Sequence, residues 1–427
     1  MTMMISRRAL LGSLALGGSA TLLPRAAFAW TNAEALYPAT YAFIKGFVDR
    51  RELAGAIAAI GKDQAPPDYL GAGKQAMDSQ RAVAPDTIWR LYSMTKPVTG
   101  MAAMLLIEDG KMTLDQPIAD FLPAFASMKV QNTPDGSITD VHPAKGPITV
   151  RQLLTHTAGL GYNIVQKGPL RDAYNEAGIL GGQVSRLPIP GFPPTTPAPS
   201  LEVFADRLAT LPLVYEPGTR WSYSVGLDLM GRVIEVASGQ PFDAFLKARI
   251  FDPLGMASTG FRVTGDEEAR LSTNYAPLGG VLLPIDPATS SIYLDPPPMP
   301  YGGGGLVSTA RDYDRFLAML LGEGETGGVR IMKPETARLG MSNLLADSVD
   351  RKNTFIDGEG FGAGGRVSLA GSPTGEGVYG WGGAAGTVAF VDRRRGYRVG
   401  GYTQYMPSEA LPFQRDFGKA FYKDVMA

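Results

Sequence analysis

Cysteine is absent from the sequence, and histidine is nearly so, with only His142 and His156 among 427 residues. Disulfide bonds and thiolate metal sites are therefore excluded, and a catalytic zinc ion is disfavoured because it usually takes several imidazole ligands. The composition still allows a magnesium or calcium ion bound by Asp and Glu carboxylates. We expect no metal and no other cofactor.

An excess of charge of either sign is also lacking, because 40 Lys and Arg residues balance 41 Asp and Glu residues. Nucleic acids and anionic membranes are bound by clustered Lys and Arg, so neither is expected as a partner. After the N-terminal segment, no run approaches the roughly 18 uninterrupted apolar residues of a membrane span, so we expect no stable membrane insertion of the mature chain. Hydrophobic residues still make up 44% of the chain, enough for a sizeable core. The composition leaves the oligomeric state open.

The N-terminus has the pattern of an export signal. Arg7 and Arg8 precede a weakly apolar run over 9–23, which is too short to cross a bilayer comfortably. The small-x-small sequence Ala27-Phe28-Ala29 then suits a signal peptidase, with Trp30 as the new first residue. We interpret residues 1–29 as a signal peptide of twin-arginine type and expect a periplasmic or secreted protein. The alternative is a buried N-terminal helix.

Strand patterns occur near both ends of the chain, and helix patterns lie between them. Periodicity and capping signals predict helices over 39–48, 98–108, 201–210, 226–237, 242–251, 310–321 and 414–426. Alternating or branched runs predict strands over 53–60, 87–92, 387–392 and 397–403, with a hairpin turn at 393–396. A Thr-x-x-Gln capping box at 149–152 is expected to open a short helix that carries His156. Proline excludes helix and central strand from 188–199 and 296–300.

These patterns predict an α+β fold in which both chain ends build one antiparallel sheet. Residues 30–427 would form the mature domain, with an α/β lobe at roughly 30–95 and 300–427. A mostly helical lobe, at roughly 96–299, would be inserted between them. A cleft between two lobes is the natural place for a site.

Ser93-Met94-Thr95-Lys96 is the only Ser-x-x-Lys in the chain. Residues three apart on a helix share a face, so Lys96 would place its amine beside the Ser93 hydroxyl. Pro97 is tolerated only in the first turn of a helix, which puts the helix start, with its free N–H groups, close to Ser93. A serine hydroxyl is a weak nucleophile until a base takes its proton, and a buried lysine can be such a base. The alternative is an N-cap serine beside a solvated lysine.

Four further sites have both a chemical and a structural interpretation. Tyr223, at the end of a turn-rich loop, is either a proton carrier or a packed aromatic residue. The segment Trp381-Gly382-Gly383-Ala384 either lets a ligand approach an edge strand or marks a bulge. His156 could be the base of a Ser-His-Asp triad, but the chain has no Gly-x-Ser-x-Gly elbow, so a structural role is favoured. The glycines at 302–305 could suggest a phosphate-binding loop, but no Gly-Lys-Ser/Thr follows them. They are interpreted as a tight turn before a helix capped near Ser308 or Thr309.

The order of these motifs resembles a known family. Ser93-x-x-Lys96, then Tyr223-Ser224-x, then Trp381-Gly382-Gly383 is similar to the class C β-lactamase and penicillin-binding-protein superfamily, above all to the family VIII carboxylesterases. The likeness covers nearly all of the mature chain, including segments 153–160, 217–224, 251–256 and 303–309.

The resemblance implies a β-lactamase/transpeptidase-like fold and a serine hydrolase. It implies Ser93 as nucleophile, with Lys96 and Tyr223 as general base and acid in a division that the sequence leaves open. The backbone N–H groups of Ser93 and Ala384 would form the oxyanion hole. Ser224, together with the strand segment at 381–383, would contact the substrate.

Two departures from the lactamases bear on the substrate. Val225 stands where they have Asn, and Trp381-Gly382-Gly383 stands where they have Lys-Thr-Gly. The loss of a charge-assisted hydrogen bond to a substrate carboxylate is worth about 1.5–3 kcal/mol. We therefore expect a neutral small-molecule ester, cleaved through an acyl-Ser93 intermediate. The alternatives are a β-lactamase or D-Ala-D-Ala peptidase, and an inactive binding or sensor protein on the same scaffold.

Overall fold

The computed structural model describes residues 33–187 and 195–426. The predicted signal peptide at 1–29 lies outside these residues, as does most of the proline-rich stretch at 188–199. Within the described ranges, no helix combines the length and the apolar character needed to cross a membrane.

One seven-stranded antiparallel sheet forms the frame, in the order β11-β12-β13-β14-β15-β1-β2. Its strands are β1 (Gly55–Lys62), β2 (Asp68–Gly73), β11 (Gly360–Phe361), β12 (Arg366–Val367), β13 (Val378–Gly382), β14 (Val388–Asp392) and β15 (Tyr397–Tyr402). The N-terminal strand β1 pairs with the C-terminal strand β15, with Ala59 opposite Gly400. The prediction that both chain ends build one antiparallel sheet is confirmed.

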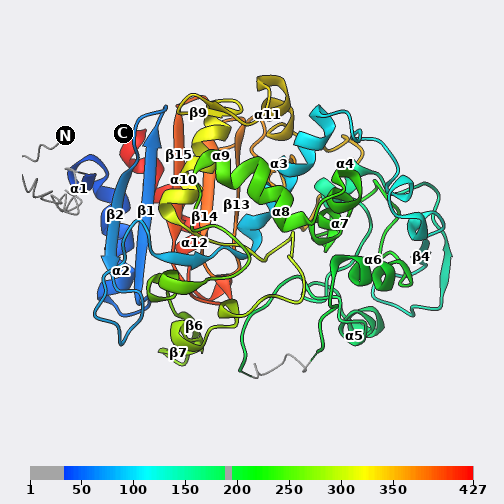
Figure 1. Ribbon diagram of the computed structural model, residues 1–427, viewed down its shortest axis with the longest axis horizontal. Helices are drawn as coiled ribbons and strands as arrows, with labels where there is room; N and C mark the ends of the chain where they lie inside the picture. The colour runs from blue at the N-terminus through cyan, green and yellow to red at the C-terminus, as the bar shows by residue number, and fades with distance from the viewer. Residues whose placement is uncertain (1–32, 188–194, 427) are drawn as a thin grey trace, which may run out of the picture.

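Both faces of this sheet are covered by helices, because β1 is apolar on both sides. Ala56, Ala58 and Ile60 pack in one core cluster with α2 (Pro38–Asp49) and α12 (Phe413–Val425). The alternate residues Ile57 and Ala59 belong to the other cluster, together with α10 (Ala310–Leu321). The result is a helix–sheet–helix arrangement (Figure 1).

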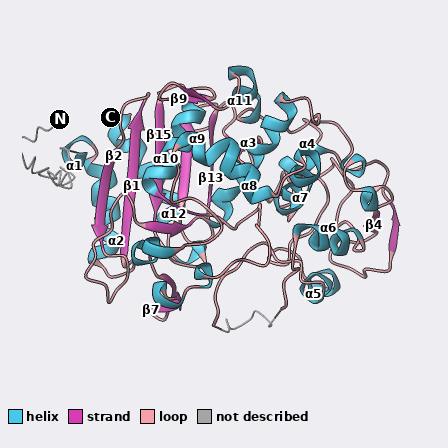
Figure 2. Cartoon of the chain, in the orientation of Figure 1, coloured by secondary structure: helices cyan, strands magenta, loops and turns pink. Residues whose placement is uncertain are grey.

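The remaining helices are mostly gathered beyond the β13 side of the sheet, away from β2 (Figure 2). They are α1 (Ala33–Leu36), α3 (Thr95–Glu108), α4 (Val150–Leu154), α5 (Gly168–Glu176), α6 (Leu201–Ala209), α7 (Gly226–Ser238), α8 (Phe242–Leu246), α9 (Asp252–Leu254) and α11 (Pro334–Gly340). Helix α3 lies at the centre, with every residue from Thr95 to Leu106 buried. At Gly100 an added Cβ would lie 2.1 Å from the Ala363 carbonyl oxygen, so the backbones touch there.

Four two-stranded pairs complete the fold. They are β3 (Ile88–Arg90) with β8 (Val307–Thr309), β4 (Lys129–Gln131) with β5 (Val141–Pro143), β6 (Asn274–Leu278) with β7 (Val281–Asp286), and β9 (Glu325–Thr326) with β10 (Val329–Arg330). The predicted cap at Thr309 is confirmed, because its hydroxyl accepts a hydrogen bond from Asp312 N at 3.0 Å.

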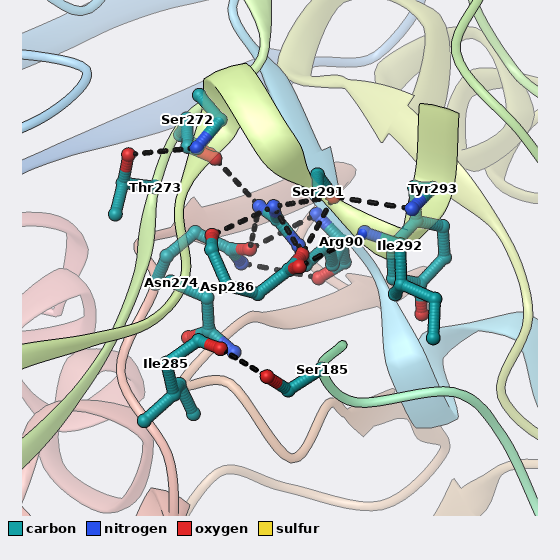
Figure 3. Close-up of polar contacts among 12 residues, drawn as sticks. Arg90, Ser185, Ser272, Thr273, Asn274, Ile285, Asp286, Ser291, Ile292 and Tyr293 are labelled. Carbon is teal, nitrogen blue, oxygen red and sulfur yellow. Dashed lines mark hydrogen bonds and ion pairs between the residues drawn. The ribbon is translucent and has the colours of Figure 1, made fainter. Parts of the chain in front are cut away.

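A buried ion pair fixes strand β3. The guanidinium of Arg90 donates to the Asp286 carboxylate at 2.7 Å and to the Ser272 carbonyl oxygen at 2.6 Å, and Ser291 bonds to the same carboxylate (Figure 3). Both charged side chains are almost fully buried, and a buried pair is tolerable only when its hydrogen-bonding atoms are satisfied in this way. The network joins β3 to β7 and so anchors the strand that leads into Ser93.

Two predicted elements differ from the structure. The capping box forms as expected, but α4 ends at Leu154 and does not reach His156. His156 has φ of 57°, a left-handed conformation that cannot continue an α-helix. The predicted strand over 87–92 shortens to β3, because Tyr92 has φ of 44° and turns the chain into a 3₁₀ turn at Tyr92–Met94.

Candidate active site

Ser93 sits at the junction between a strand and a helix. It belongs to the 3₁₀ turn between β3 and α3, and Pro97 is the third residue of α3. The turn is held from the strand side, where Leu91 N donates to the Leu306 carbonyl oxygen at 2.9 Å. The prediction that a helix starts within about one turn of Ser93 is confirmed. Ser93 itself is only partly buried, so a substrate can reach its hydroxyl.

Lys96 is completely buried, and its amine points at Ser93. The distance from Lys96 Nζ to Ser93 Oγ is 3.1 Å, as the three-residue spacing predicts. The amine also donates to the Gly303 carbonyl oxygen at 2.6 Å and lies 4.5 Å from the centre of the Tyr223 ring. One nitrogen is thus held against a hydroxyl, a carbonyl oxygen and an aromatic face.

Tyr223 reaches the same hydroxyl from a distant part of the chain. It lies just before α7, and its hydroxyl donates to Ser93 Oγ at 2.7 Å. Trp381 Nε1 donates in turn to the Tyr223 hydroxyl at 3.4 Å. The structure therefore brings Ser93, Lys96 and Tyr223 together within the 2.6–3.2 Å range in which protons can pass between side chains.

The glycine-rich segment lies beside this group, although β13 is not the edge strand that the sequence predicts. Strand β12 pairs with β13 only as far as Gly380, so Trp381 and Gly382 are paired on the β14 side alone. An added Cβ at Gly383 would lie 2.1 Å from the Leu91 carbonyl oxygen, which explains why a glycine is needed there. Within the described residues, no acceptor is recorded for the N–H of the next residue, Ala384.

His156 and Ser224 form a buried pair behind Tyr223. His156 Nδ1 and Ser224 Oγ are 3.0 Å apart, and the imidazole lies 4.8 Å from the Tyr223 ring centre. Burial, with a smaller contribution from the Lys96 charge, holds the pKa of His156 well below its ordinary value. The imidazole is therefore neutral near pH 7 and supports Tyr223 by packing. The Ser224 hydroxyl is occupied by His156, so the predicted substrate contact at this residue stays a prediction.

Sequence reasoning missed Asp228, on the first turn of α7. Its carboxylate accepts a hydrogen bond from Gly303 N at 2.8 Å, while Thr99 Oγ1 donates to the Gly302 carbonyl oxygen at 2.7 Å. An added Cβ at Gly303 would lie 2.5 Å from the Asp228 carboxylate. The segment that supports Lys96 is therefore clamped between α3 and α7. The available signals were the glycine run at 302–305, interpreted only as a turn, and a lone acid at the start of an apolar helix.

Burial raises the pKa of Asp228 to about 6, against the attraction of Lys96 and the hydrogen bond from Gly303, which both lower it. Folded protein thus holds this proton more tightly than unfolded chain, so its stabilising contribution is complete below about pH 4 and is lost as pH rises through 6. Asp228→Asn has no such dependence. We expect the unfolding free energy of wild type minus that of Asp228→Asn to fall by about 2–3 kcal/mol between pH 4 and pH 7.5. Urea unfolding of both proteins across this range measures it, and a constant difference would contradict the buried, ionisable state of Asp228.

Several known proteins are similar to this chain in sequence and in fold. Esterase EstB of Burkholderia gladioli is 30% identical over 375 residues, covering 82% of this chain and 85% of its own length. Protein Rv1367c of Mycobacterium tuberculosis is 35% identical over 359 residues, covering 81% and 84%. The solved structure of EstCE1, described as a hydrolase with promiscuous acyltransferase activity, matches with a TM-score of 0.74 at 26% identity, over 92% of this chain and 99% of that one.

The fold and these relatives identify the chain as a serine hydrolase. More narrowly, it belongs to the beta-lactamase family, whose sequence model matches residues 41–420. The predicted resemblance and the β-lactamase/transpeptidase-like fold are thereby confirmed. Within residues 33–187 and 195–426, no three His, Asp or Glu side chains are grouped so that they could hold a metal ion.

Proposed function

We propose that this protein hydrolyses neutral carboxylic esters through an acyl-Ser93 intermediate. The observation that carries the proposal is the double contact of Ser93 Oγ, at 3.1 Å from Lys96 Nζ and 2.7 Å from the Tyr223 hydroxyl. A hydroxyl held between two groups that exchange protons is the arrangement that activates a serine nucleophile.

In the proposed reaction, Ser93 Oγ attacks the ester carbonyl carbon and gives its proton to the Lys96–Tyr223 pair. The N–H groups of Ser93 and Ala384 stabilise the oxyanion that forms. The carbon–alcohol bond then breaks, the alcohol takes the proton back from Tyr223, and the acyl group stays on Ser93. Water attacks this acyl ester by the same proton route in reverse, which releases the acid and restores the serine.

The surroundings of the site favour an ester over an anionic lactam. Val225 is fully buried at the position where lactamases carry a polar Asn, and Trp381 places an indole ring where they carry a cation. A carboxylate-bearing substrate would find no charged partner at either position. The names of EstB and EstCE1 point in the same direction.

A panel of substrates tests the proposal. Wild-type protein is expected to cleave 4-nitrophenyl acetate and butyrate with kcat/KM at least about 100-fold above that for a chromogenic cephalosporin, a difference of about 2.7 kcal/mol in activation free energy. A fluorophosphonate probe should add to the peptide that contains Ser93, as read by mass spectrometry. A preference for the cephalosporin would favour a lactamase or peptidase, and an unlabelled Ser93 would favour a binding protein.

A further inference from the structure

Phe355 is an exposed aromatic side chain placed against the proposed catalytic tyrosine. Its side chain is 63% exposed, yet its ring centre lies 5.9 Å from that of Tyr223 and 6.4 Å from that of the buried Trp221. Both contacts are edge-on, with interplanar angles of 89° and 85°, which is a favourable geometry for aromatic pairs. Most of the Phe355 ring surface is thus left free beside the site.

The backbone fixes this position. The loop that carries Phe355 pairs with the segment that carries Tyr223, through Trp221 N to the Asp350 carbonyl oxygen and Asp350 N to the Thr219 carbonyl oxygen, each at 2.9 Å. The loop is also braced internally, where Thr354 Oγ1 donates to the Arg351 carbonyl oxygen at 2.6 Å. Phe355 and Tyr223 therefore share one frame, and the exposed ring is a fixed part of the site's border.

Trp381 supplies a second aromatic surface beside Tyr223. Its ring centre lies 5.8 Å from that of Tyr223, and the buried Phe361 supports it at 5.3 Å. Trp381 is only partly buried, so part of the indole also remains free. The Tyr223 side chain is therefore bordered by two uncharged aromatic side chains with unoccupied surface, an environment suited to flat apolar groups.

We propose that Phe355, together with Trp381, forms a binding subsite for the alcohol part of the ester, and that this subsite takes aromatic or other flat apolar alcohols. The inference rests on the proposed function, in which Tyr223 returns a proton to the leaving alcohol. The group that protonates the leaving oxygen must touch it, so the rest of the alcohol lies beside Tyr223, where Phe355 stands. Phe355 is a specificity-determining residue that takes no part in the proton transfers.

Two acetates with the same acyl group and different alcohols test this subsite. For 2-naphthyl acetate, Phe355→Ala is expected to raise KM about five- to tenfold, the value of one lost aromatic contact, while kcat/KM for methyl acetate stays within about twofold. Phe355→Trp keeps an aromatic surface and should stay near wild type on both. Leu339→Ala is the matched control, because Leu339 is also an exposed apolar residue but lies on α11. This variant should leave the kinetic constants for both acetates unchanged. If Phe355→Ala lowers kcat/KM by the same factor for both acetates, the proposal is overturned.

Binding of the product alcohol separates this inference from the proposed function. Calorimetric titration of 2-naphthol into Ser93→Ala and into Ser93→Ala/Phe355→Ala should show at least fivefold weaker binding in the double variant. If wild type cleaves no ester but this dependence is found, the proposed function fails and the subsite stands. If esters are cleaved while 2-naphthol binds both variants equally, the subsite is overturned.

Discussion

Replacing Ser93 with alanine is expected to lower kcat/KM for 4-nitrophenyl acetate by about 10⁴-fold or more, the scale seen when a serine nucleophile is removed. The loss follows from the geometry, because Lys96 and Tyr223 both make contact with Ser93 Oγ and would be left without a group to activate. Residual turnover would come from the oxyanion donors and binding alone. Initial rates corrected for spontaneous hydrolysis measure the effect.

The fold should survive this substitution. Lys96 keeps the Gly303 carbonyl oxygen as acceptor, and the Tyr223 hydroxyl keeps its contact with Trp381, so the cost in stability is expected to be about 1 kcal/mol or less. Ser342→Ala, at the surface beyond α11, is the matched control and should retain activity within about twofold of wild type. A folded Ser93→Ala protein with near wild-type turnover would refute the nucleophile assignment.

The local part of the site could be predicted from sequence alone. Ser93 and Lys96 are neighbours because helical spacing puts them on one face, and Pro97 fixed where that helix begins. Tyr223 is different, since it contacts Ser93 across 130 residues of chain. Its own sequence context left it open between a proton carrier and a packed aromatic residue, and only the ordered resemblance to a family selected the first.

Features that depend on close approach of distant segments were not predictable. Asp228 meets Gly303 only because α3 and α7 pack together, and Phe355 meets Tyr223 only through pairing of two irregular loops. The sequence predicts His156 on a helix because a capping box marks where a helix starts and says little about where it ends. The two-residue strands β11 and β12 are too short to show a strand pattern, so the sequence predicts β13 at the edge of the sheet.

The sheet itself was predictable for a physical reason. Strands β14 and β15 are local partners across a four-residue turn, so their pairing could be predicted from a short stretch of sequence. Strand β1 is apolar on both faces, which requires covering layers on both sides of the sheet. Its pairing with β15 brings the chain ends together and leaves the intervening residues to form the helices that carry Lys96 and lead out from Tyr223.

Replacing Tyr223 with phenylalanine is expected to lower kcat by about 10³-fold for an alkyl ester, within the range for loss of a general acid–base group. The change removes only the hydroxyl that donates to Ser93, while the ring can keep its packing against His156 and Trp381 and its place beneath the Lys96 amine. KM and the unfolding temperature should therefore change little. Tyr402→Phe is the matched control, because the Tyr402 hydroxyl is buried without a hydrogen-bond partner among the described residues.

The choice of ester reveals what Tyr223 does. An alkoxide is a poor leaving group and needs a proton as the bond breaks, whereas 4-nitrophenolate leaves without one. If Tyr223 protonates the alcohol, Tyr223→Phe should lose about tenfold more activity on methyl acetate than on 4-nitrophenyl acetate. Equal losses on both esters would instead make Tyr223 the base that deprotonates Ser93, since that step is common to both. A loss below about tenfold on both esters would leave Lys96 as the sole proton carrier and contradict the paired role that the 2.7 Å contact implies.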